Sequence, residues 1–188
     1  FNVFILNTIL DRDHTVIALF TLMLGGMVGI IYRNGGMHGI IQLLIKKANT
    51  PKKGQISIWL FGIIIFFDDY SNTLIVGNTS RLLCDKLGIS REKLAYLVDS
   101  TSAPVATVAV ITTWIGFQIS IISDSIEGIT DLSESAYLLF IHSIAYSFYP
   151  FLALFLVGLV VTMGKDFGPM VEAEIRARNN KDKKVEET

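Results

Sequence analysis

Hydrophobic positions fall into long blocks separated by short charged stretches. Residues 15–32 (TVIALFTLMLGGMVGIIY) form an uncharged run, and about 20 residues of helix cross a hydrocarbon core roughly 30 Å thick. Residues 137–163 form a longer run in which Pro150 is the expected kink. We therefore predict transmembrane helices over 15–32 and 137–163.

The block that ends at Phe67 is equally apolar but too short to cross alone. As a helix, residues 55–67 would reach about 20 Å before they meet Asp68 and Asp69. The stretches before and after this segment are both basic, and basic residues of short loops stay on the cytoplasmic side. A single crossing would put the two stretches on opposite sides. We therefore predict a re-entrant hairpin over 55–80 that enters from the cytoplasm, turns at 68–72 and returns through 73–79.

The same rule places the other loops. Residues 33–53, 81–93 and the tail 164–188 are rich in Lys and Arg and should be cytoplasmic, whereas 123–136 contains acidic residues and no basic residue. The tail is interpreted as a cytoplasmic tail or a linker between repeats. Residues 37–47 are amphipathic and predict an interfacial helix on the lipid headgroups.

Residues 91–122 are too long for one plain helix and contain the polar run 99–104 (DSTSAP), which ends at Pro104. Because proline removes a backbone donor and disfavours helix just before it, we predict a broken transmembrane helix with its break at 99–104. The predicted fold is an all-α polytopic membrane protein with a re-entrant hairpin and a discontinuous helix, in a single membrane domain over 1–188.

Composition supports this class and excludes others. Hydrophobic residues make up 51% of the chain, and 16 basic against 17 acidic residues give a net charge of −1, so nucleic acid is not an expected partner. No phosphate loop, zinc-ligand spacing or nucleophile elbow occurs. We therefore expect no enzyme activity and no cofactor, and the lipid bilayer as a partner.

The candidate site consists of oxygen-bearing side chains in the hairpin and the broken helix. An Asp at the bilayer centre is disfavoured by roughly 2.5 to 3.5 kcal/mol, and two neighbouring carboxylates there cannot easily both ionise. Hard cations such as sodium prefer oxygen ligands. The predicted ion or substrate ligands are Asp68, Asp69, Ser71, Asn72, Thr73, Asn78, Thr79, Asp99, Ser100, Thr101 and Ser102.

Other interpretations stay open at this point. The Asp pair could mark a helix end at the membrane surface. The hydroxyls could bond back to helix carbonyls. The N-terminal ends of half-helices could instead hold an anionic substrate.

The segments 67–79 (FDDYSNTLIVGNT), 99–106 (DSTSAPVA) and 113–116 (TWIG) resemble the NhaC-type Na+/H+ antiporter family within the ion transporter superfamily. The resemblance implies a larger protein of two inverted repeats in the cytoplasmic membrane of a prokaryote, of which this chain is a fragment of about one repeat. It implies that residues 71–73 form a hairpin-tip motif for sodium, and that the second repeat completes the site. A homodimer stays open.

Three functional hypotheses follow. The leading one is Na+/H+ antiport by alternating access, with Na+ and H+ as competing cargo of the intramembrane carboxylates. In this hypothesis Asp69, Asn72 and Thr73 are the Na+ ligands. The second keeps the fold but couples Na+ or H+ to exchange of a carboxylate or amino acid. The third, of another class, is a scaffold subunit of the membrane that does not transport.

Overall fold

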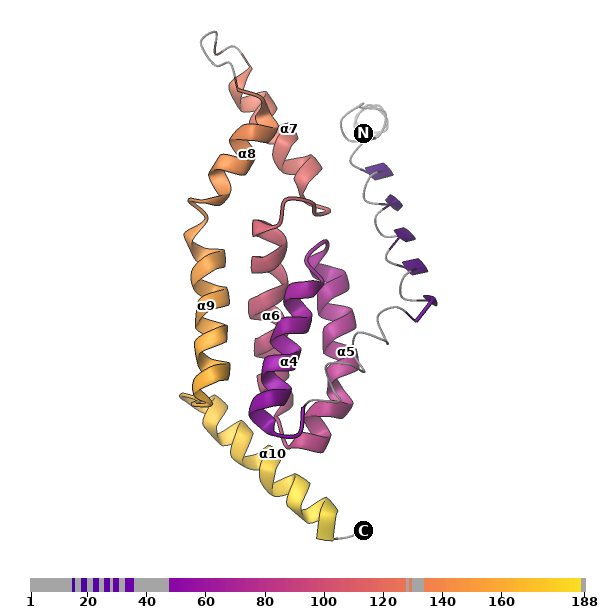
Figure 1. The fold of residues 1–188 in the computed structure, drawn as a ribbon, viewed down its shortest axis with the longest axis vertical. Coiled ribbons are helices and arrows are strands. Elements are labelled where there is room, and N and C mark those ends of the chain that lie inside the picture. Colours follow the sequence, from indigo (N-terminus) through magenta and orange to yellow (C-terminus); the bar gives the residue numbers. More distant parts are fainter. Residues whose placement is uncertain are drawn as a thin grey trace, which may run out of the picture.

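A computed structural model gives the structure of the chain. It describes residues 48–127, 129 and 134–186, with the side chains up to 180, and a set of positions between 15 and 35. The elements keep the labels of Figure 1, which begin at α4. All elements in these ranges are helices: α4 (Pro51–Ile64), α5 (Asp69–Leu87), α6 (Arg91–Val108), α7 (Ile115–Ile126), α8 (Ala136–Ile144), α9 (Phe148–Met163) and α10 (Pro169–Glu186).

Local sequence explains where most of these helices begin and end. The side chains of Thr50, Asp68 and Ser90 accept hydrogen bonds from backbone N–H groups in the first turns of α4, α5 and α6, which is the role of N-cap residues. Gly88 ends α5 and Gly164 ends α9, each in a left-handed conformation that glycine adopts without strain.

The helices α4 and α5 form a hairpin that packs against α6, and α9 lies against α4 and α6 (Figure 1). Ile58, Phe61, Val76, Leu97 and Val161 are buried where these four helices meet. The helices α7 and α8 pack on each other and extend beyond the tip of the hairpin (Figure 1). The tip therefore lies partway along the molecule rather than at its end.

One described helix is long and apolar enough to cross a membrane. It runs over Ala136–Met163, with a mean hydropathy of 2.2 in its most apolar window, and overlaps the predicted span 137–163. A short turn at 145–147 divides it into α8 and α9. The interruption precedes Pro150, which sits in the first turn of α9, where its missing N–H is tolerated.

The hairpin differs from its predicted boundaries. The turn occupies 65–68, and Ser71 and Asn72 already belong to the first turn of α5, which continues to Leu87. The predicted turn at 68–72 is therefore wrong by about one helical turn. The reason is that Asp68 caps α5 and so starts the helix directly after itself.

The predicted break at 99–104 is also wrong, because α6 continues through Pro104 to Val108. The helix is interrupted at 109–114 instead, and α7 begins at Ile115. Pro104 is buried inside α6, where packing on α4, α5 and α9 outweighs the one backbone hydrogen bond that proline removes.

The remaining predicted segments are only partly described. The described positions between 15 and 33 are helical, in the predicted span 15–32. The predicted interfacial helix over 37–47 lies outside the described residues. The predicted tail 164–188 contains α10, which packs on α5 and α6.

Candidate functional site

The tip of the hairpin lies against the break between α6 and α7. The backbone N–H of Thr113 donates to the Phe67 carbonyl at 2.9 Å. The Thr113 hydroxyl donates to one carboxylate oxygen of Asp68 at 2.9 Å, while the other oxygen accepts from the Ser71 N–H at 2.7 Å. Asp68 therefore caps α5 and also joins the hairpin to the break.

Asp69 makes a second bridge to the same break. Its carboxylate accepts a hydrogen bond from the Trp114 indole N–H at 3.0 Å. Trp114 remains 41% exposed, so this contact lies at the edge of the packed region. Both predicted carboxylates thus face donors from the α6–α7 break.

Asn72 is the most deeply buried member of the predicted site, with an exposure of 0%. Its amide nitrogen donates to the carbonyls of Gly62 at 2.7 Å and Ile65 at 2.8 Å. These carbonyls belong to the C-terminal end of α4, where helical carbonyls lack partners within the helix. The Asn72 side-chain oxygen has no hydrogen-bond partner, so it is a buried acceptor that a cation or a donor can satisfy.

Hydroxyl groups of α5 and α6 meet next to Asn72. The Thr73 hydroxyl donates to the Ser102 hydroxyl at 3.1 Å. Thr101 is buried and donates to the Leu97 carbonyl at 2.6 Å. A Cβ atom placed on Gly62 would lie 2.9 Å from the Thr101 methyl group, so glycine is needed for α4 to approach α6 this closely.

The predicted residues farther along α5 and α6 are not part of this cluster. Asn78 and Asp99 are exposed and line an open groove of about 760 Å³ between α5 and α6, together with Thr73 and Arg81. Thr79 and Ser100 are half-buried. The site that was predicted as one set is therefore divided between the tip, the buried α4–α5–α6 contact and the groove.

The three predicted Na+ ligands have separate neighbours. Asp69 bonds to Trp114, Asn72 to the end of α4, and Thr73 to Ser102. Among the described residues, no three His, Cys, Asp or Glu side chains are close enough to hold a metal ion. Asp68, Asp69 and Asn72 belong to the turn and the first helical turn of one hairpin arm.

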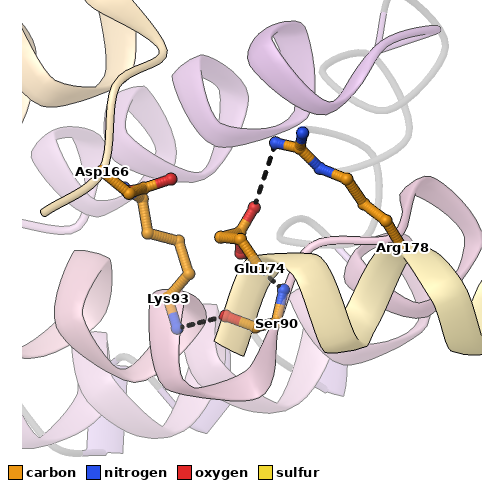
Figure 2. A network of polar contacts seen from close by, with 5 residues as sticks. All are labelled: Ser90, Lys93, Asp166, Glu174 and Arg178. Carbon is orange, nitrogen blue, oxygen red and sulfur yellow. Dashed lines mark hydrogen bonds and ion pairs between the residues drawn. The ribbon is translucent and has the colours of Figure 1, made fainter. Parts of the chain in front are cut away.

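Sequence reasoning missed two groups of residues. The first is the α6–α7 break, where Thr112 is buried and Thr113 and Trp114 bond to the carboxylates. The β-branched run over 110–113 (VITT), which lowers helix propensity, was a usable signal. The second lies at the other end of α5, where Lys93, Asp166 and Glu174 form a polar network (Figure 2). These residues are far apart in sequence, so no local sequence pattern indicates that they form a network.

Comparison with known proteins agrees with a membrane transporter. Residues 105–188 match the sequence model of the Na+/H+ antiporter family, which is a family of transporters and not of enzymes. The chain is also 25% identical over 171 residues to an uncharacterized protein of Haemophilus influenzae, covering 91% of this chain and 33% of that protein. The chain thus spans about a third of the length of the curated relative it matches. No solved structure matches. From the α6–α7 region to its C-terminal end, the chain is therefore similar to the Na+/H+ antiporter family.

Proposed function

We propose that the full-length protein that contains this chain exchanges Na+ for H+ across a prokaryotic cytoplasmic membrane. The observation that carries the proposal is the contact of Asp68 and Asp69, at the hairpin tip, with the α6–α7 break. Interrupted helices that meet within the membrane are the places where secondary transporters bind ions. The similarity of residues 105–188 to the Na+/H+ antiporter family supports the same activity.

The distribution of charge supports a re-entrant hairpin that enters from the cytoplasm. Lys52 and Lys53 start α4, and Lys86 and Arg91 flank the α5–α6 turn. Figure 1 shows these two places at the same end of the molecule, with α7 and α8 at the other. Under the positive-inside rule, the basic end is cytoplasmic, and the tip lies inside the bilayer.

Competition between Na+ and H+ for the carboxylates would couple the two fluxes. Na+ prefers oxygen ligands, and Asp69, together with the unpartnered oxygen of Asn72, would supply part of its shell. Protonation of the Asp68–Asp69 pair would remove the charge that attracts Na+. A second repeat in the rest of the protein would complete the shell, and alternation of the hairpin contacts between two states would change the side to which the site is open.

The test is Asp69→Asn in the full-length protein in everted vesicles. We expect the variant to abolish the Na+-induced collapse of the proton gradient, because the neutral side chain cannot exchange a proton for Na+. Asp85→Asn is the matched control, because Asp85 lies near the opposite end of α5 and pairs with Arg91 at 2.8 Å. Retained exchange with normal pH dependence in Asp69→Asn would contradict the proposal.

The groove between α5 and α6 favours one second candidate. It combines Arg81 with Asn78 and Asp99 in an open space of about 760 Å³, and arginine binds carboxylates well. The alternative function is Na+- or H+-coupled exchange of a carboxylate or amino acid. Uptake of Na+ that requires such a substrate, and that is lost in Arg81→Gln, would identify it.

A further inference from the structure

The polar network at the cytoplasmic end of the proposed hairpin joins α10 to the α5–α6 turn. The Glu174 carboxylate of α10 accepts a hydrogen bond from the Ser90 N–H at 2.7 Å. Ser90 is the N-cap of α6, and its hydroxyl accepts from the Lys93 N–H at 3.0 Å. Figure 2 shows Glu174 directed at Ser90, with Arg178 on its other side. One side chain of α10 thus bonds to the residue that starts α6.

A second contact binds the link between α9 and α10 to the same turn. Lys93 is 1% exposed, and its ammonium group forms an ion pair with Asp166, which precedes α10. Glu174 is also buried, with a side-chain exposure of 3%. Charged side chains are almost never this buried unless they are paired. The two contacts therefore act together on the first turn of α6.

We infer that α10 is a reversible clamp on the α5–α6 turn and that Glu174 is the positioning residue that closes it. The clamp is reversible because the interaction of buried charges roughly balances the loss of their hydration, so water can replace the partners when α10 leaves. Apolar packing adds little, since most α10 side chains up to 180 are exposed and Ala173 is the only buried hydrophobic residue among them.

The single cysteine of the chain, Cys84, lies next to α10 and can report its release by chemical labelling. Cys84 has an exposure of 0%, and it lies at an open pocket of about 560 Å³ that Ala173 and Ala177 of α10 also line. Cys84 lies near the C-terminal end of α5, whose first turn carries the tip residues. Release of α10 should therefore expose the thiol. It should also free the C-terminal end of α5, the helix whose first turn carries Asp69.

The experiment measures the rate at which a maleimide labels Cys84 in the full-length protein, by mass spectrometry of the Cys84 peptide. Glu174→Ala should raise the rate roughly tenfold or more, because a buried hydrogen bond to a charged group is lost. Glu174→Gln keeps an oxygen that can accept from Ser90 and should raise it less. Glu172→Gln is the matched control, because Glu172 is an exposed acid on the same helix, and it should label at the wild-type rate.

Each result decides the inference. Labelling of Glu174→Ala at the wild-type rate would overturn it, and so would labelling of Glu172→Gln as fast as that of Glu174→Ala. If Glu174→Ala does not reach the membrane, faster labelling of Glu174→Gln than of Glu172→Gln supports the clamp, and equal rates overturn it.

A second measurement tests the positioning role and rests on the proposed function. Glu174→Ala should slow Na+/H+ exchange several-fold, with partial rescue in Glu174→Gln. Faster labelling with unchanged exchange would overturn the positioning role of Glu174 while the proposed function stands. If the wild-type protein exchanges no Na+, the proposed function fails, and the labelling series still tests the clamp.

Discussion

The side chain of Asn72 gives the sharpest prediction, because its amide nitrogen and its amide oxygen have different roles. Its amide nitrogen donates to the Gly62 and Ile65 carbonyls at 2.7 and 2.8 Å, and its oxygen has no partner. The end of α4 has no basic residue in its last turn, and its C-cap, Ile65, is not in a left-handed conformation. Asn72 therefore takes the place of a C-terminal cap for α4.

Replacement of Asn72 by alanine leaves two buried carbonyls without donors. Each unsatisfied group is unfavourable by about 1 to 3 kcal/mol, so the hairpin should lose about 2 to 6 kcal/mol of local stability. Hydrogen exchange of the peptides that span 61–72 measures this directly, and 2 kcal/mol corresponds to about 30-fold faster exchange. Asn78→Ala is the matched control, since Asn78 is exposed on the same helix and should change stability by less than about 0.5 kcal/mol.

Asn72→Asp separates the capping role from ion binding. Aspartate keeps the oxygen that could bind Na+, but it replaces the donor by an acceptor that faces two carbonyl oxygens. The capping role predicts that Asn72→Asp destabilises the hairpin at least as much as Asn72→Ala. Wild-type protection of residues 61–72 in either variant would refute this reasoning.

Two further predictions concern close packing and thiol chemistry. Gly62→Ala should loosen the α4–α6 contact, because the new Cβ would lie 2.9 Å from the Thr101 methyl group. Adding Thr101→Ser, which removes that methyl group, should restore the protection of residues 61–72 from hydrogen exchange. A double variant that is no better protected than Gly62→Ala would contradict this packing. Burial raises the pKa of the Cys84 thiol to about 12. Labelling of the wild-type protein should therefore stay far slower than labelling of the denatured protein at pH 9, where an exposed thiol is largely ionised, and equal rates would contradict this burial.

Hydropathy and charge predicted the helical class and, to within about one helical turn, the turn between α4 and α5, because both patterns act over many residues. They did not predict where the helices break. Pro104 suggested a break, but its ring is buried within a continuous α6. The interruption at 109–114 is stabilised by contacts to the hairpin tip, such as Thr113 to Phe67, and these tertiary contacts are not visible in a local pattern.

The candidate site was predicted by residue type but not by grouping. Asp68 and Asp69 were selected as carboxylates in an apolar context, and the structure adds that each accepts a side-chain hydrogen bond from a residue 45 positions away. Asn78 and Asp99 were selected as oxygen-bearing side chains of the same two segments, yet they line the groove. A period of 3.6 residues distributes neighbouring polar residues around a helix, and only packing decides which of them meet.

The lengths of the helices bear on the depth of the Asp pair. The 14 residues of α4 rise about 20 Å, less than the roughly 30 Å of a hydrocarbon core. The segment Ala136–Met163 has 28 residues. Even with its turn at 145–147, α8 and α9 together have 9 and 16 helical residues, a rise of roughly 38 Å that is enough to cross with tilt, and α9 lies against α4. If the basic end of the molecule meets the headgroups, α4 stops short of the opposite surface.

A helix end at the membrane surface would not need its carboxylates to accept hydrogen bonds from Thr113 and Trp114, because water would satisfy them. The engaged carboxylates and the short α4 therefore both favour a tip within the bilayer over one at its surface.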